Sequence, residues 1–153
     1  MRTLLLMVTT LLVLPVMAGP PQAYPFQSFD KAMQQARAEN KTLFVYFGRQ
    51  GCGYCEKTNK EAFSDKQVRE TYSKHYVLAY IDSESGKRLR LPSGERVTER
   101  ELGTRYNAFV TPVFTFMTAD GQTLLRLVGV QRIEDLRDAD TNVQDLLTKA
   151  GNP

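Results

Sequence analysis

The sequence contains few of the cysteine and histidine side chains that bind zinc, copper or haem. Its 153 residues include two cysteines, Cys52 and Cys55, and one histidine, His75. A structural zinc site takes four cysteine or histidine ligands, so these three residues do not complete one. Covalent haem attachment takes a histidine directly after the second cysteine, where this chain has Glu56. We therefore expect no metal and no cofactor, although two soft thiolates leave a copper carrier as an open alternative.

The sequence also lacks an apolar run of about 20 residues, the length that crosses a bilayer. Its longest run, residues 4–16, follows the positive charge of Arg2, is interrupted by Pro15 and is soon followed by the small residue Ala18. This layout is typical of a secretory signal peptide. We expect residues 1–18 to be removed by cleavage after Ala18, which would export the protein and leave no stable membrane anchor.

Length and charge indicate one globular domain with no marked electrostatic preference. Hydrophobic residues make up 42% of the chain and charged residues 24%, close to the globular average, and the net charge is +3. Three arginines fall between residues 88 and 96, but glutamates are interleaved with them, so we expect a solvated loop and no nucleic-acid partner. No added dimerisation domain is visible, and we expect a monomer.

Apolar residues spaced three and four apart predict the helices. Ser28 and Asp65 stand where helix caps are expected, and Thr98 with Glu101 matches a capping box. The last helical region is expected to break near residues 138–140, where aspartates cluster. The predicted helices cover residues 29–39, 54–63, 65–74, 99–105 and 133–147.

Short β-branched and aromatic runs predict four strands, at residues 42–47, 76–82, 113–118 and 123–128. The Asp120-Gly121 step predicts a hairpin between the last two. The polar residues 83–97 predict an inserted loop or small hairpin. Residues 19–27 are rich in proline and predict an extended arm that leads into a folded domain at residues 28–150.

The two cysteines lie where a strand gives way to a helix, and this position carries redox chemistry. Cys52 comes first, near the unpaired N–H groups and positive end of the helix dipole, both of which favour thiolate over thiol. We predict Cys52 as the nucleophile and Cys55, one turn further, as the thiol that resolves the mixed disulfide. Gly53 permits the tight turn and Tyr54 offers an amphipathic ring, so we predict both as substrate contacts.

The strand, the Cys-X-X-Cys pair, the helix and the later step Val110-Thr111-Pro112-Val113 together resemble the thioredoxin superfamily over residues 28–148. The resemblance implies an α/β fold in which helices flank a central mixed sheet of about four to five strands. It also implies that the peptide bond before Pro112 is cis and that the Pro112 ring packs against the cysteines. Thr111 and Pro112 are then predicted substrate-binding residues.

More narrowly, the stretches around Cys52, at residues 61–65 and at residues 106–112 resemble the periplasmic thioredoxins of bacterial sulfur oxidation. This resemblance implies a periplasmic reductase that acts on cysteine-containing protein substrates and receives electrons from a membrane thiol donor. The sequence alone does not fix the direction of electron flow. The alternative is a copper-binding or thiol-protein-binding module of the same fold without turnover.

Two positions depart from the thioredoxin pattern. Gly51 stands where a tryptophan usually precedes the first cysteine, and Tyr46 stands where a buried aspartate usually assists deprotonation of the second. Proton transfer at Cys55 must therefore use another group, for which Glu56, Lys57 and water are the candidates.

Overall fold

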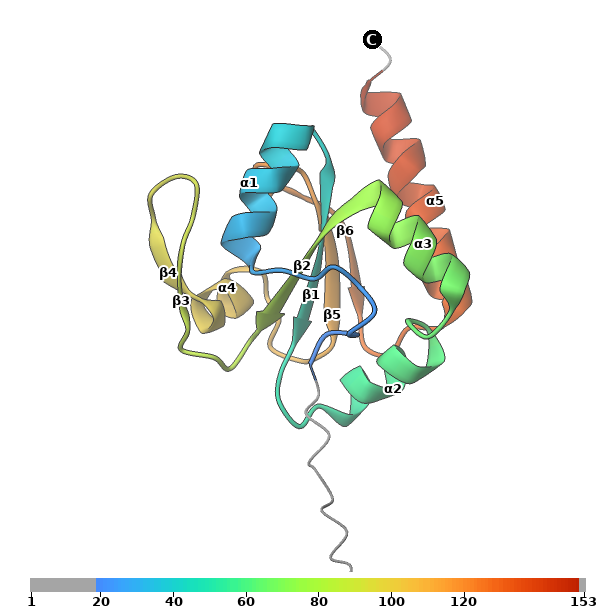
Figure 1. Ribbon diagram of the computed structural model, residues 1–153, viewed down its shortest axis with the longest axis horizontal. Helices are drawn as coiled ribbons and strands as arrows, with labels where there is room; N and C mark the ends of the chain where they lie inside the picture. The colour runs from blue at the N-terminus through green and yellow to red at the C-terminus, as the bar shows by residue number, and fades with distance from the viewer. Residues whose placement is uncertain (1–18, 152–153) are drawn as a thin grey trace, which may run out of the picture.

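A four-stranded mixed sheet forms the centre of the computed structural model, which describes residues 19–151 (Figure 1). The sheet has the strand order β2-β1-β5-β6, in which β1 is parallel to β2 and antiparallel to β5, and β5 is antiparallel to β6. The strands are β1 (Thr42–Gly48), β2 (Tyr76–Asp82), β5 (Val113–Met117) and β6 (Thr123–Val128). The predicted α/β thioredoxin fold is thus confirmed.

Helices cover both faces of this sheet. They are α1 (Phe29–Glu39), α2 (Gly53–Glu61), α3 (Lys66–His75), α4 (Glu99–Arg105) and α5 (Ile133–Ala150). Side chains alternate along β1, so Leu43, Val45 and Phe47 pack with α1 and α4 on one face. Phe44 and Tyr46 pack with α2, α3 and α5 on the other. Every residue of β1 is buried, as is usual for a strand at the centre of a covered sheet.

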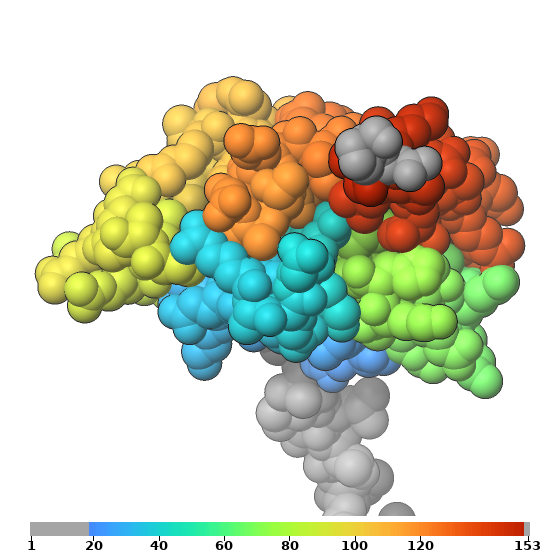
Figure 2. Space-filling model, turned by 90° about the horizontal axis from the view of Figure 1, so that it is seen from above, coloured from blue at the N-terminus to red at the C-terminus, as the bar shows by residue number. Residues whose placement is uncertain are grey.

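The polar insert forms the small hairpin that its sequence allows. Its strands are β3 (Arg88–Arg90) and β4 (Arg96–Thr98), in which Leu89 and Val97 are paired and buried. The arginines of both strands are exposed. Figure 2 shows the hairpin projecting from the body of the molecule.

The helices α1, α3 and α4 begin at the predicted cap residues. The Asp65 carboxylate accepts a hydrogen bond from the Val68 N–H at 2.8 Å at the start of α3. At the start of α4, the Glu101 N–H donates to the Thr98 hydroxyl at 3.2 Å and the Thr98 N–H donates to the Glu101 carboxylate, which completes the capping box. Ser28 occupies the cap position of α1, although its hydroxyl makes no capping hydrogen bond.

The predicted break near residues 138–140 is wrong, because α5 is continuous. Its middle is held by contacts with distant residues. Ala139 is buried, and the Asp140 carboxylate lies 2.6 Å from the Tyr76 hydroxyl and 2.8 Å from His75 Nδ1. These contacts favour helical backbone at positions where aspartate by itself disfavours it.

The N-terminal arm packs along the domain. Gln27 pairs with the edge of β2, where its N–H donates to the Leu78 carbonyl at 3.1 Å and its carbonyl accepts from the Tyr80 N–H at 3.0 Å. Tyr24 is buried against Phe63. The predicted signal peptide, residues 1–18, lies outside the described residues. Between residues 19 and 151, no helix has both the length and the hydropathy to span a bilayer.

Candidate active site

The central strand delivers the chain to the cysteine pair. β1 ends at Gly48, where a Cβ atom would lie 2.7 Å from the Tyr80 hydroxyl oxygen, so any larger residue would make the Tyr80 ring shift. Gly51 follows with φ of +67°, in the left-handed region that favours glycine. Cys52 is then the N-cap of α2, at the lower end of the sheet in Figure 1. The loop therefore places the first sulfur at the positive end of a helix.

Cys52 and Cys55 form a disulfide with an S–S distance of 2.04 Å. Both residues are buried, with 3% and 1% of their surface exposed. Two donors reach Cys52 Sγ: the Cys55 backbone N–H at 3.1 Å and the Thr111 hydroxyl at 3.2 Å. Each would stabilise negative charge on this sulfur once the disulfide is reduced, as would the dipole of α2.

Thr111 and Pro112 come to the disulfide from the start of β5. The peptide bond between them is cis, as predicted. The hydrogen bond from the Thr111 side chain to Cys52 was not predicted, since the sequence resemblance implied only a role in substrate binding for Thr111. The hydroxyl itself was the available signal, because it adds a donor to a residue expected beside the cysteines.

Three exposed apolar side chains form a rim near the buried sulfurs. Tyr54, Phe109 and Val110 have 68%, 73% and 59% of their surface exposed. They line a groove of about 350 Å³ that also reaches Thr111 and the side of α4. Gly53 is exposed at the start of α2. The predicted site residues are therefore together, and Phe109 and Val110 extend the set.

Tyr46 packs against α2, at the position where thioredoxins usually have a buried aspartate. Its side chain is fully buried, and its hydroxyl oxygen is 3.4 Å from the Cys55 carbonyl oxygen. Burial raises the pKa of Tyr46 far above its ordinary value, so the phenol stays protonated wherever thiols titrate. Glu56 and Lys57, the predicted proton-transfer candidates, are exposed on α2, and Lys57 Nζ lies 3.9 Å from Glu61.

The described part of the chain contains no group of three or more His, Cys, Asp or Glu side chains placed to hold one metal ion. His75 lies at the end of α3 and bonds to Asp140 of α5. It ties these two helices together.

Comparison with known proteins relates the fold to a family. A family model described as a thioredoxin-like domain matches residues 29–143. Comparison with curated protein sequences gave no match.

Several solved structures share the architecture. A thioredoxin from Thermus thermophilus is 23% identical, with a TM-score of 0.64 over 80% of this chain and 88% of that one. A structure described as a candidate disulphide-isomerase from Bacteroides thetaiotaomicron is 29% identical, with a TM-score of 0.61 over 78% and 91%. A structure named DsbH oxidoreductase is 16% identical, with a TM-score of 0.63 over 79% and 85%. The similarity covers most of each chain.

Proposed function

The chain belongs to the family of thioredoxin-like domains, and from this premise we propose that it is a thiol:disulfide oxidoreductase that works through Cys52 and Cys55. One observation carries the proposal. The Cys52–Cys55 disulfide sits at the N-terminus of α2, with the Thr111 hydroxyl 3.2 Å from Cys52 Sγ and a groove of mixed apolar and polar lining that reaches Thr111. The structure described as a candidate disulphide-isomerase, at 29% identity, adds support, because that name refers to chemistry on the same kind of bond.

The exchange proceeds in two balanced steps. In the reduced protein, the Cys52 thiolate attacks a substrate disulfide, forms the Cys52–substrate bond and releases one substrate sulfur as thiolate. Cys55 then loses its proton and attacks Cys52 Sγ, which forms the Cys52–Cys55 bond and releases the second substrate thiolate. Counted from the protein dithiol to the substrate dithiol, with protons exchanged through solvent, the substrate gains two electrons and two protons and the protein loses the same number. A thiol donor must then reduce the protein again.

The groove gives this reaction a place for the substrate. Both sulfurs are buried in the disulfide-bonded form, and the proposed route for a partner passes the exposed side chains of Tyr54, Phe109 and Val110. Exposed aromatic and aliphatic side chains bind an extended peptide by burying its apolar surface. The proposed substrates are therefore cysteine-containing proteins that offer an apolar segment beside the disulfide.

The proposal extends to direction and location. We place the protein in the periplasm as a monomeric reductase, exported by the signal peptide at residues 1–18 and reduced by a membrane thiol donor. The link to sulfur oxidation is part of this proposal and rests on the sequence resemblance alone. N-terminal sequencing of the exported protein tests the leader, because it should begin at Gly19.

Trapping of mixed disulfides tests the exchange in cells. The variant Cys55→Ser can attack through Cys52 but cannot release, so disulfide-linked complexes should accumulate in the exporting compartment and disappear on reduction. Cys52→Ser is the matched control and should form none. Identical patterns in the two variants would rule out the mechanism. Tight stoichiometric Cu(I) binding by the reduced protein, together with no disulfide exchange, would favour the copper-binding alternative.

A further inference from the structure

The Tyr46 phenol links β1 to α2 at the resolving cysteine. Tyr46 Oη lies 3.4 Å from the Cys55 carbonyl oxygen and 3.2 Å from Asn59 Oδ1. Asn59 stands four residues after Cys55, so both lie on one face of α2. The Tyr46 ring is held between Phe63, at a centroid distance of 5.9 Å, and Phe114, at 4.7 Å. The hydroxyl therefore has little freedom to leave its partners.

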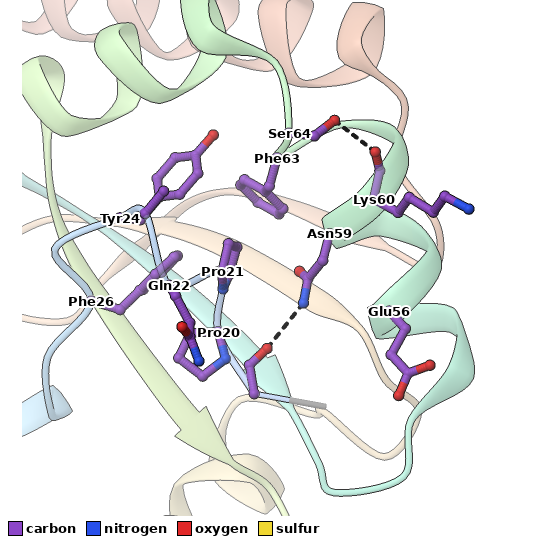
Figure 3. A pocket seen from close by; sticks show the side chains of 12 residues that line it. Pro20, Pro21, Gln22, Tyr24, Phe26, Glu56, Asn59, Lys60, Phe63 and Ser64 are labelled. Atoms are coloured by element: carbon purple, nitrogen blue, oxygen red, sulfur yellow. Dashed lines mark hydrogen bonds between the residues drawn. The ribbon is translucent and has the colours of Figure 1, made fainter. Parts of the chain in front are cut away.

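The contact between Asn59 and Gly19 determines which groups donate in this series of hydrogen bonds. Asn59 Nδ2 lies 3.0 Å from the Gly19 carbonyl oxygen, which can only accept (Figure 3). The amide N–H must therefore face Gly19 and the amide oxygen must face Tyr46. Because that oxygen accepts, Tyr46 is the donor. Its one proton is shared between the Asn59 side chain and the Cys55 carbonyl.

The N-terminal arm forms the other wall of this region. Figure 3 shows Tyr24 of the arm beside Phe63, and the two rings meet edge to face at a centroid distance of 5.3 Å. Both line a hollow between the arm and α2. The Phe26 ring also packs against the Tyr46 ring, with a centroid distance of 6.1 Å. The arm is thus fixed to β2 through Gln27 and to α2 through Gly19. α2 is held from the sheet below and from the arm beside it.

We infer that Tyr46 and Asn59 are positioning residues that hold Cys55 in reach of Cys52 by tying the first turn of α2 to β1 and to the N-terminal arm. The inference rests on the proposed function, because it concerns the step in which Cys55 attacks the mixed disulfide. Here the Cys52–Cys55 bond forms, the Cys52–substrate bond breaks, and the leaving sulfur takes the electron pair. The geometry of Cys55 sets how often this attack succeeds.

A neutral donor suits this role. A buried carboxylate at position 46 would repel a thiolate on Cys55, whereas the phenol gives a hydrogen bond and no charge. Burial keeps the Tyr46 hydroxyl protonated through neutral and mildly alkaline pH. The chain of hydrogen bonds therefore holds over the range in which the cysteines titrate.

The test measures the effective concentration of Cys55 toward Cys52, obtained from the equilibrium of the purified protein, residues 19–153, with glutathione and its disulfide. Tyr46→Phe keeps the ring and removes the donor, so we expect the effective concentration to fall about three- to tenfold. Tyr72→Phe is the matched control, because it removes an equally buried hydroxyl that donates to the Leu136 carbonyl at 2.7 Å. It should lower the free energy of unfolding and leave the effective concentration within twofold.

Asn59→Ala keeps the test decisive if Tyr46→Phe does not fold, since Asn59 is only half-buried. It should lower the effective concentration in the same direction, and the double variant should lose less than the product of the two single losses, because both act through one chain. Equal effective concentrations in Tyr46→Phe and Tyr72→Phe would overturn the inference while leaving the proposed function intact. A wild-type protein that does not exchange with glutathione would overturn both.

Discussion

Removal of the Thr111 hydroxyl should change the reactivity of Cys52 in a defined way. In Thr111→Val the side chain keeps its shape and loses the donor that lies 3.2 Å from Cys52 Sγ. In the reduced protein this donor favours the thiolate, so its loss should raise the pKa of Cys52. The Cys55 N–H remains as the second donor, at 3.1 Å.

The size of the effect follows from one charge-assisted hydrogen bond. Such bonds contribute roughly 1.5–3 kcal/mol, and the half-buried position of Thr111 argues for the lower end. Because about 1.4 kcal/mol corresponds to one pH unit, the pKa of Cys52 should rise by about one pH unit. Thr111→Ser keeps the hydroxyl and should stay close to the wild type.

The assay is the pH dependence of alkylation of the reduced protein, with Cys55 replaced by serine in every variant so that only Cys52 reacts. Below the wild-type pKa, Thr111→Val should react about tenfold more slowly, and above both pKa values the rates should converge. A Thr111→Val variant that titrates like the wild type would refute the reasoning. So would a Thr111→Ser variant that shifts as far as Thr111→Val.

Three further predictions concern the rim, a helix cap and the loop before the cysteines. Phe109→Ala should raise KM for a protein disulfide several-fold and change the free energy of unfolding by less than about 0.5 kcal/mol, since Phe109 is exposed; an unchanged KM would contradict a role in docking. The Thr98 N–H and hydroxyl hold the pKa of Glu101 below its ordinary value of 4.5, so its contribution to stability is present above that value and is lost as pH falls through the lower folded value. In chemical denaturation, Glu101→Ala should therefore be less stable than the wild type at pH 7, and a difference that did not shrink in acid would contradict the capping role. Gly48→Ala should cost about 1–3 kcal/mol in the same measurement, because its Cβ would lie 2.7 Å from the Tyr80 hydroxyl oxygen; unchanged stability would show that the ring moves aside freely.

Local patterns in the sequence were sufficient for most of the fold. The apolar run of β1 and the capping residues Asp65 and Thr98 depend on neighbours within a few positions, and the elements begin and end close to where those patterns predict. The break predicted near residue 138 failed for the opposite reason. Asp140 is held in α5 by His75 and Tyr76, about 65 positions earlier, and no local pattern contains that contact.

The same distinction applies to the site. The Cys-X-X-Cys spacing and the Thr111-Pro112 step led to residues that the structure brings together, because the chemistry of two thiols at a helix start is local and the proline was matched by resemblance. The arm was predicted only as an extended segment, since its pairing with β2 joins Gln27 to Ala79. The partnership of Tyr46 with Asn59 was also missed. Its signal was present, because Asn59 lies one turn after Cys55 and Tyr46 replaces an expected acid.

Turnover by the purified protein tests the central claim most directly. The reduction of a protein disulfide by dithiothreitol is followed with and without catalytic amounts of the wild type, Cys52→Ser and Cys55→Ser. We predict that the wild type accelerates the reaction through many turnovers, that Cys52→Ser does not, and that Cys55→Ser stops as a mixed disulfide detectable by mass spectrometry. No acceleration by the wild type, or acceleration that persists in Cys52→Ser, would contradict the assignment of Cys52 and Cys55 as a redox-active pair.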